Sequence, residues 1–545
     1  MKSNKIVFVG IAIAVLFISI VGIGLIIRNQ SGGRSVDTMM KHIKVKEKTP
    51  TKASVSLDDS SLYDELPEIA KYPLAVTGYG DVNIEIMTSP EKAGKDYESW
   101  LIDVATKFNK ANVTTPSGRT IGVSVRSVSS GLAADYIISR KHTPQLFTPS
   151  NYLWGEYITA NGGDVTLLNK KMVGNTAGLL ISKGSEYNTY DSIIKAVQDG
   201  KINIGYTNPQ TSSTGMNLLI SILKDGSEDI NSDAAIDNYK KFNQNIPFVA
   251  YNTMQMRDSA SKGTLDGMIL EYQTYVNESN LNKLYDFIPF GIRHDNPLYI
   301  VGESTMPDEE IAACKVFNDY CMNSDSQSLA KKKGFNANED YKSDREITGA
   351  EVNRALAIYK ANKDNGQDII AVFVADCSGS MSGDPINQLK QSLSNGAQYI
   401  NENNMVGLVS YSTNVAIEVP IAKFDLNQRA YFQGGINSLT ASGSTASYDA
   451  IVVAMDMVNK AKEQNPDAKA MIFLLSDGYQ NQGYKLKDIT PALKDSEIPV
   501  YTISYTSDAD TDAMKKLSGI NEAATINADS DDIVYKIKSL FNSQM

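Results

Sequence analysis

A carboxylate and two hydroxyls stand at alternate positions in the segment Asp376-Cys377-Ser378-Gly379-Ser380. The apolar run before it, residues 369–375, has the length and β-branched content of a buried strand in a parallel sheet. Asp384-Pro385 then predicts a helix start, because Asp is a favourable N-cap and Pro fits the first helical position. A strand, a polar loop and a helix place these oxygens at the carboxyl edge of a sheet, where open α/β folds bind ligands. The spacing therefore predicts half of a metal site.

Two later segments offer the oxygens that this half-site lacks, since a hard divalent cation takes about six oxygen ligands. Gly443-Ser444-Thr445 opens a predicted helix, and Ser476-Asp477-Gly478 ends a predicted strand over residues 471–475. A lone D-x-S-x-S motif is also typical of a capped turn, but the three segments together favour a metal site. In order and context they resemble the metal-ion-dependent adhesion site of von Willebrand factor A (VWA) domains. The resemblance covers the last third of the chain.

This resemblance implies a Rossmann-like, doubly wound α/β fold for residues 368–545 and a bound divalent cation, Mg²⁺ or else Mn²⁺ or Ca²⁺. The residues that would hold the ion, directly or through water, are Asp376, Ser378, Ser380, Thr445 and Asp477. Two aspartates balance a 2+ charge and leave the ion electrophilic toward one further anionic oxygen. In the family, an acidic side chain of a protein partner typically fills that position. The resemblance thus implies metal-mediated protein recognition.

From residue 82 onward, predicted strands and helices alternate, which indicates βαβ units and a mainly parallel sheet. Polar turns follow the strands and precede probable helices, where free amides and hydroxyls either bind a polar ligand or cap the helix. The candidate ligand-binding residues of this region are Thr88, Ser89, Ser129, Ser130, Asn208, Ser213, Thr214 and Glu271.

Three motifs of this region are individually weak, but their order is informative. They are Gly205-Tyr206-Thr207-Asn208-Pro209, residues 266–272 and Asp295-Asn296-Pro297-Leu298-Tyr299. Together they resemble bacterial extracellular solute-binding proteins of the two-lobed, molybdate type. The resemblance implies a type II periplasmic-binding-protein-like fold over residues 79–343, with a cleft that binds or senses a small solute or docks a partner. Glu271 would repel an oxyanion, so a cationic, peptide or sugar-like ligand is as tenable as an anion.

The N-terminal region carries a charge-free apolar stretch from Ile6 to Ile27. About 20 apolar residues suffice for a helix to cross a bilayer, and no small-residue cleavage site follows. We therefore predict a transmembrane signal anchor over residues 6–27 behind a flank of residues 1–5. The flanking Lys and Arg count favours a cytoplasmic C-terminus. We nevertheless expect a single-pass cell-membrane protein with both domains extracytoplasmic, because the solute-binding family works there and long trailing domains translocate largely regardless of flanking charge.

Two polar segments connect these units. Residues 28–78 have the composition of a flexible stalk, and residues 344–367 contain a good helix former that predicts a packed connector.

The net charge of −11 argues against a nucleic-acid partner. Cys314 and Cys321 would lie about 10.5 Å apart on one helix, beyond the reach of a disulfide.

Features of an enzyme are sparse. Ser89-Pro90-Glu91-Lys92 matches S-x-x-K, but no S-D-N or K-T-G accompanies it, so we interpret it as chance. A phosphate-binding G-x-x-x-x-G-K-[ST] loop is absent from the sequence, and the three histidines occur in unrelated contexts. We expect no catalytic residues and no enzyme activity. The favoured hypothesis is a membrane-anchored binding or adhesion-type protein. The alternative is a tethered solute receptor of an ABC-type transport system, with the VWA domain as an accessory.

Overall fold

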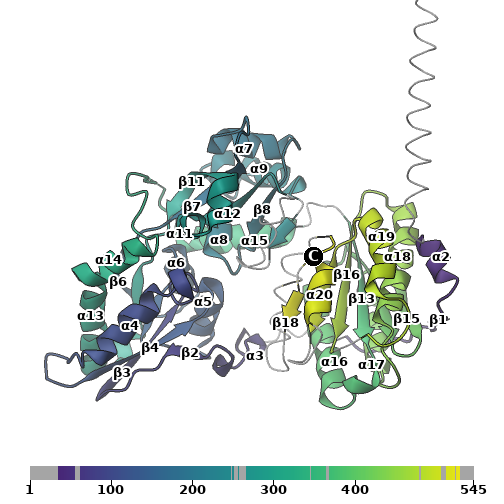
Figure 1. The fold of residues 1–545 in the computed structure, drawn as a ribbon, viewed down its shortest axis with the longest axis horizontal. Coiled ribbons are helices and arrows are strands. Elements are labelled where there is room, and N and C mark those ends of the chain that lie inside the picture. The colour runs from purple at the N-terminus through teal and green to yellow at the C-terminus, as the bar shows by residue number, and fades with distance from the viewer. Residues whose placement is uncertain are drawn as a thin grey trace, which may run out of the picture.

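The computed structural model describes residues 35–55, 62–246, 248–250, 256, 265–343, 345–363, 368–477, 480–504, 511–521, 523, 525–527 and 540. These residues form sheets of six, five and seven strands. Figure 1 shows the first two sheets as the lobes of one body and the seven-stranded sheet in a second body beside it. The predicted α/β class, with a two-lobed unit followed by a Rossmann-like unit, is confirmed.

The first lobe is built on the six-stranded sheet, in which β3 pairs in parallel with β4 and β5. In spatial order its strands are β2 (Leu74–Val76), β4 (Ile121–Ser127), β3 (Val82–Thr88), β5 (Leu146–Thr148), β12 (Leu298–Val301) and β6 (Val165–Asn169). Its helices are α4 (Trp100–Lys110), α5 (Ser130–Ser139), α6 (Leu153–Ala160), α13 (Asp308–Met322) and α14 (Ser324–Lys332). Trp100, Phe108 and Phe317 are fully buried between α4, α13 and the sheet, so this lobe has its own apolar core.

The second lobe is built on the five-stranded sheet. In spatial order its strands are β11 (Tyr285–Arg293), β7 (Thr176–Ser182), β10 (Gly267–Glu271), β8 (Ile204–Thr207) and β9 (Phe248–Ala250). Its helices are α7 (Tyr190–Gln198), α8 (Ser213–Gly226), α9 (Asp233–Gln244), α11 (Tyr272–Asn277) and α12 (Ser279–Leu284). The chain crosses between the lobes from β6 to β7 and again from β11 to β12. These two crossing segments therefore form the hinge.

The predicted connector is a helix, α15 (Gly349–Asn362), which begins with a capping box between Thr348 and Glu351. Its buried side chains Val352, Ala355 and Tyr359 belong to the same apolar cluster as residues of both lobes. In particular, α15 packs on α6 of the first lobe and α8 of the second. The connector is thus part of the two-lobed body.

The C-terminal body is a seven-stranded sheet with helices on its faces. In spatial order its strands are β1 (Val45–Glu47), β15 (Val415–Lys423), β14 (Met405–Tyr411), β13 (Ile369–Asp376), β16 (Lys469–Ser476), β17 (Val500–Ser504) and β18 (Thr525–Asn527). Its helices are α2 (Val36–Met40), α16 (Asp384–Gly396), α17 (Leu426–Ser438), α18 (Ser447–Gln464), α19 (Leu486–Ser496) and α20 (Thr511–Ser518). All neighbouring strands are parallel except β14 and β15. Every residue of β13 is buried, as expected for the centre of such a sheet.

One end of this sheet comes from the N-terminal segment. The sequence predicts a flexible stalk over residues 28–78, but β1 pairs in parallel with β15, and Lys48 forms an ion pair with the buried Glu418 at 2.6 Å. Met39 of α2 is fully buried in the cluster that includes α18. In Figure 1 both N-terminal elements lie at the outer edge of the C-terminal body, beside β15 and α18. Much of the expected stalk is therefore folded, because its few apolar residues pack on a neighbouring sheet.

The two bodies contact each other at the amino edge of the seven-stranded sheet. A cleft of about 370 Å³ between the bodies is lined by Ile246 and Val249 on one side and by Ile369 and Tyr501 on the other. Since β13 begins at Ile369 and ends at Asp376, its carboxyl end lies about 23 Å from this contact at ~3.3 Å per residue.

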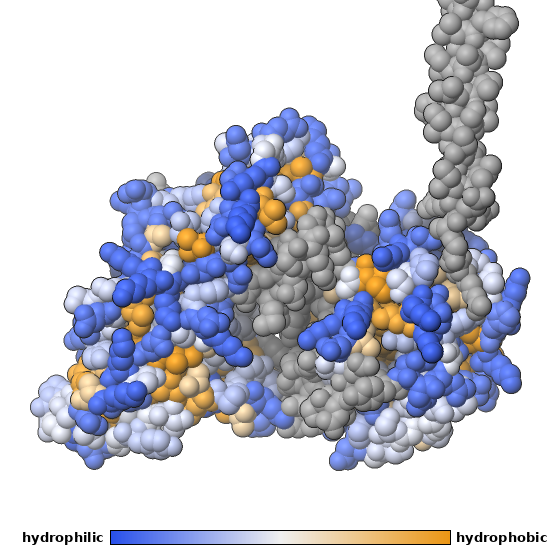
Figure 2. Space-filling model, viewed as in Figure 1, coloured by the Kyte–Doolittle hydropathy of each residue, from blue (hydrophilic) through white to orange (hydrophobic). Residues whose placement is uncertain are grey.

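The surface carries no single broad apolar face in the view of Figure 2, where hydrophobic residues form several separate patches on a mostly hydrophilic surface. Among the described residues, no helix has the length and apolar character needed to span a bilayer. The predicted anchor, residues 6–27, lies outside the described residues.

The packing of α2 generates a test of the N-terminal segment. We expect Met39→Ala to destabilise the C-terminal body by about 2–5 kcal/mol, because it deletes a fully buried side chain. Hydrogen exchange of the β13–β15 amides measures this loss. Both tryptophans, Trp100 and Trp154, lie in the two-lobed body, so the tryptophan fluorescence transition should stay unchanged. Lys41→Ala, at an exposed position, is the matched control. If the β13–β15 amides of the Met39→Ala variant exchange as slowly as those of the wild type, α2 is not part of this fold.

Candidate functional site

The five predicted metal ligands follow neighbouring strand ends of the seven-stranded sheet. Asp376 is the last residue of β13, and Ser378 and Ser380 lie in the loop after it. Asp477 follows β16, while Thr445 precedes α18. Because β13 and β16 pair in parallel with Ala375 opposite Leu475, the residues that follow emerge at the same edge. All five predicted residues therefore belong to one edge of the sheet.

Side-chain contacts link four of these residues directly. The hydroxyls of Ser378 and Ser380 are 3.0 Å apart, and Ser380 Oγ donates to Asp477 Oδ1 at 3.0 Å. The Ser378 amide donates to Asp376 Oδ1 at 2.9 Å. Oxygens from two separate loops thus converge within hydrogen-bond distance.

The segment that carries Thr445 is fixed to the same loop through its backbone. Gly379 N donates to Gly443 O at 3.0 Å, and Thr445 N donates to Asn481 Oδ1 at 2.8 Å. Gly443 has a φ of +82°, and a side chain there would lie 2.5 Å from Thr413 Oγ1. Glycine is therefore required where this segment passes Thr413, in the turn between β14 and β15.

Two hydroxyls to which the sequence analysis gave no role hold Asp376 in place. Its Oδ2 accepts hydrogen bonds from Tyr411 at 2.9 Å and from Ser476 at 2.6 Å. Tyr411 ends β14 directly opposite Asp376, and Ser476 ends β16. The position of Ser476 directly after the predicted strand over residues 471–475 was the available signal, whereas no strand ending at Tyr411 was predicted.

The loop after Ser380 differs in one detail from the prediction. Asp384 does not cap α16: it is the first helical residue, and Gly383, with a φ of +87°, occupies the N-cap position. Pro385 lies in the first turn as expected. The positive φ explains the difference, because glycine adopts this backbone conformation without strain.

The charge of the cluster suits a cation. Asp376 is fully buried and Asp477 is 8% exposed. Burial and then the charge of Asp376 raise the pKa of Asp477 above its usual value, so two carboxylates without a counterion destabilise each other. No group of three or more His, Cys, Asp or Glu suited to a metal occurs in the described part of the chain. The candidate set instead combines two carboxylates with hydroxyls, which is an oxygen-only set suited to a hard ion.

Several of the predicted solute-binding residues lie where the two lobes contact each other. Hydrogen bonds join the lobes directly: Gly131 N donates to Thr211 O at 3.3 Å, and Trp154 Nε1 donates to Ser213 Oγ at 2.9 Å. Ser130 Oγ accepts from Ser150 N at 3.3 Å. The predicted residues therefore contact one another and their neighbours across the cleft.

Glu271 pairs with residues of the hinge. Its Oε1 is 2.6 Å from His294 Nδ1, and its Oε2 accepts from Asn175 Nδ2 at 2.6 Å. His294 Nε2 in turn lies 3.1 Å from Asn151 Nδ2 and 3.2 Å from Asn217 Nδ2. The sequence analysis assigned His294 no role, although it adjoins the Asp295-Asn296-Pro297 motif.

Lys92 is also fully buried, although the sequence analysis interpreted its S-x-x-K motif as chance. Its ammonium donates to Ser89 Oγ at 2.7 Å and to Asn296 Oδ1 at 2.6 Å. Ser150 Oγ donates to Ser89 Oγ at 3.2 Å. Burial lowers the pKa of Lys92 to about 8. The S-x-x-K spacing thus reflects a real contact within the cleft.

The remaining predicted residues are placed as follows. Thr88 ends β3 and is fully buried, and Ser129 precedes α5 at a half-buried position. Thr214 is 2.9 Å from the hydroxyl of Thr207, and Asn208 is buried in the turn after β8. Their role toward a solute stays a prediction.

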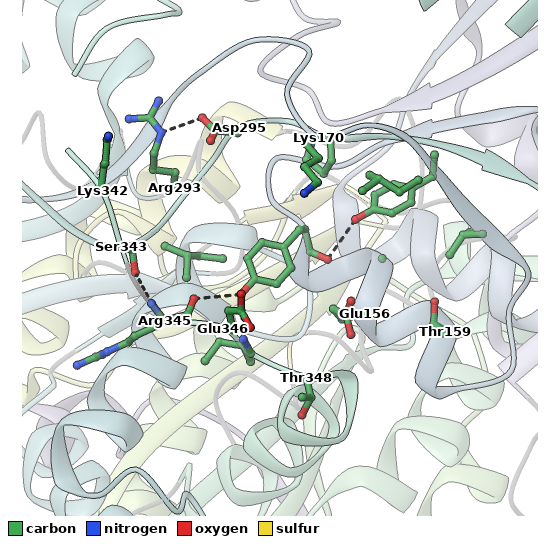
Figure 3. Close-up of a pocket in the computed structure, with 18 residues that line it drawn as sticks. Glu156, Thr159, Lys170, Arg293, Asp295, Lys342, Ser343, Arg345, Glu346 and Thr348 are labelled. Atoms are coloured by element: carbon green, nitrogen blue, oxygen red, sulfur yellow. Dashed lines mark hydrogen bonds and ion pairs between the residues drawn. The ribbon is translucent and has the colours of Figure 1, made fainter. Parts of the chain in front are cut away.

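A cavity of about 820 Å³ lies on the hinge side of the two-lobed body, apart from these residues. Figure 3 shows Arg293 turned toward Asp295, with Lys170 and Glu156 on the opposite wall. Arg293 pairs with Asp295 at 2.9 Å, and Arg345 pairs with Asp225 at 2.6 Å. The arginines of the cavity are thus already compensated by carboxylates.

Comparison with known proteins identifies two families in the chain. Residues 93–336 match the bacterial extracellular solute-binding proteins, and residues 371–541 match the von Willebrand factor type A domain. A von Willebrand factor A domain-containing protein of Dictyostelium discoideum is 28% identical over 176 residues, which cover 31% of this chain and 18% of that protein. Inter-alpha-trypsin inhibitor heavy chain H2 of Mus musculus is 28% identical over 158 residues, covering 28% of this chain and 17% of that protein. The match spans less than a fifth of each relative.

Solved structures similar to this chain include representatives of both domain types. The sulfate-binding protein SubI from Mycobacterium tuberculosis H37Rv has a TM-score of 0.35 and 16% identity, over 47% of this chain and 88% of that chain. The von Willebrand factor type A structure from Catenulispora acidiphila has a TM-score of 0.30 and 17% identity, over 32% of this chain and 42% of that chain. From the family matches, the chain combines a solute-binding protein domain with a C-terminal von Willebrand factor type A domain, two domain types that typically bind rather than catalyse.

Proposed function

We propose that this protein is a membrane-anchored extracytoplasmic binding protein, in which the VWA domain recognises a protein partner through a divalent metal and the two-lobed domain binds a small solute. The observation that carries the metal proposal is the contact of Ser380 with Asp477 and Ser378. It brings the loops after β13 and β16 together beside the buried Asp376. Asp376 and Asp477 are both buried carboxylates of this cluster, and a cation would balance their charges.

The residues that would hold the ion are Asp376, Ser378, Ser380, Thr445 and Asp477. When bound, the ion supplies a Lewis-acidic position for one external carboxylate, as in the implied adhesion site. Tyr411 and Ser476 orient Asp376 through hydrogen bonds, and Gly443 lets the Thr445 segment pass close to Thr413. Mg²⁺ or Mn²⁺ suits this set of hard oxygens.

The position of the site supports an external partner. The solute-binding domain contacts the VWA domain at the amino ends of the strands, whereas the five residues lie at the carboxyl ends. Ser380 is exposed while Asp376 is buried, so the cluster is open on one side. A partner carboxylate would therefore approach without displacing the solute-binding domain.

Metal binding is testable by calorimetry on the full chain in detergent. We expect Asp477→Ala to weaken Mg²⁺ binding at least about tenfold, because it removes one of only two carboxylates of the set. Asp467→Ala, an exposed carboxylate of the same domain, should bind as the wild type does. Equal Mg²⁺ affinity in wild type and Asp477→Ala would contradict the site.

Partner recognition is testable by capture from solubilised membranes. We expect EDTA to release the partner and added Mg²⁺ to restore capture, because the partner oxygen would complete the metal's coordination. Asp477→Ala should abolish capture even with Mg²⁺ present. Capture that persists in EDTA would argue against a metal-mediated interface.

Topology is testable by adding protease to intact cells. We expect digestion of both domains, because the apolar segment 6–27 predicts an anchor and solute-binding proteins act outside the cytoplasm. A cytoplasmic protein of the same cells should survive as the control. Digestion that requires permeabilised cells would place the domains inside, as the flanking-charge count favours.

A further inference from the structure

Buried ionisable side chains gather where the two lobes meet, and their charges are uneven. Three ionisable side chains, Lys92, Glu271 and His294, are 0–5% exposed. Glu91 adjoins them: the residue is partly exposed, but its Oε2 is inaccessible to solvent and has no hydrogen-bond partner. Which of these groups carries charge decides what the cleft can bind.

His294 is held as the neutral imidazole. Its Nδ1 faces the Glu271 carboxylate and must donate, whereas its Nε2 faces amide nitrogens of Asn151 and Asn217 and must accept. The Asn217 amide is fixed in this orientation because it donates to Ile292 O and accepts from Ile292 N, both at 2.9 Å. One proton on Nδ1 and none on Nε2 leaves His294 uncharged.

The cleft therefore contains two carboxylates and one ammonium. With both carboxylates ionised, the formal charge of Glu91, Lys92, Glu271 and neutral His294 is −1. Burial and the charge of Glu271 raise the pKa of Glu91, while the Lys92 ammonium lowers it. A buried negative charge is costly when it is not fully compensated, which favours a ligand that brings a positive charge.

Three unpaired polar atoms around this cluster are acceptors only: Asn151 Oδ1, Gln273 Oε1 and Glu91 Oε2. Asn208 Nδ2 is an unpaired donor, and the hydroxyls of Thr148 and Thr274, which can donate or accept, are also buried without a partner. The residues that carry these atoms end or follow β3, β5, β8 and β10, the strand ends that face each other between the lobes. Asn151, Asn208 and Gln273 are 0% exposed. Buried acceptors without donors call for a ligand that donates hydrogen bonds.

An oxyanion fits this environment poorly. Lys92 is the cation on which it would depend, but two of the three ammonium donors already go to Ser89 and Asn296. The oxyanion would also enter beside Glu91 and Glu271, and repulsion between buried like charges is strong.

We propose that the interlobe cleft takes a small organic cation with N–H donors, whose charge is balanced by Glu91 and Glu271. This inference rests on the proposed solute-binding function and names the class of solute.

The test compares charged ligands with uncharged isosteres on the full chain in detergent. The probes are putrescine against 1,4-butanediol and ethanolamine against ethylene glycol, with sulfate and molybdate as oxyanions. We expect an amine to raise the Tm of the transition followed by Trp100 and Trp154 fluorescence by about 2–8 °C, since a ligand that binds only the folded state stabilises it. The diols and the oxyanions should not shift it.

Glu91→Gln removes the charge and keeps the shape. We expect it to weaken amine binding at least about tenfold, whereas Glu186→Gln, at an exposed position of the same domain, should bind normally. An amine shift that Glu91→Gln retains would overturn the charge argument. The amine–diol comparison needs no variant, so the proposal stays testable if Glu91→Gln does not fold.

The outcomes separate this proposal from the function on which it rests. A shift with sulfate or molybdate and none with the amines would overturn the cation while leaving solute binding intact. A shift with neither class would overturn both and favour a lobed domain that docks a protein.

Discussion

In-register parallel pairing of β13 with β16 is the constraint on which the metal site depends. The two strands place Ala375 opposite Leu475, so Asp376 and Asp477 leave the sheet at the same edge. A slip of one residue would turn the Asp376 side chain to the other face of the sheet. Buried apolar side chains on both faces of β13 fix this register, because either slip would exchange the two packed faces. The polar site thus depends on the apolar strand that precedes it.

The same register supplies the hydroxyls that hold Asp376. Tyr411 lies opposite Asp376 in β14, and its hydroxyl donates to the carboxylate from within the core. The buried Tyr411 would lack a charged acceptor without Asp376, and Asp376 would lose two of its donors without Tyr411 and Ser476. Such a network stabilises one orientation of the carboxylate with or without an ion.

The solute-binding domain lies, in chain order, between two strands of one sheet. β1 precedes it and β13 follows it, and both belong to the seven-stranded sheet. Two connections therefore join the domain to its neighbour, while α15 packs on both lobes before the chain enters β13. This arrangement restricts the relative orientation of the two bodies more than a single linker would.

Local sequence patterns predict those parts of the structure that are determined by residues close to one another in the sequence. The α/β class, the two bodies and the segments around Asp376, Thr445 and Asp477 follow from apolar strands with polar ends. The β1 strand was not predicted, because three residues in a polar segment carry no periodicity and acquire order only by pairing with β15. Lys92 and His294 were missed for a similar reason. The S-x-x-K spacing specifies only the contact of Lys92 with Ser89, whereas Asn296, Glu271, Asn151 and Asn217 come from the hinge and from both lobes, which no local pattern specifies.

The two candidate sites meet the same electrostatic difficulty in different surroundings. In each, burial and then a neighbouring carboxylate raise the pKa of one acidic side chain, Asp477 at the sheet edge and Glu91 in the cleft. At the edge, Ser380 is exposed and the additional oxygens are hydroxyls, which suits a hard ion that an external carboxylate can reach. In the cleft, the lobes close over the carboxylates, and the additional acceptors are amide oxygens. Buried carboxylates and amide oxygens favour a ligand that donates hydrogen bonds and is enclosed by the protein. Exposure, more than charge, therefore distinguishes a site for a protein partner from a site for a solute.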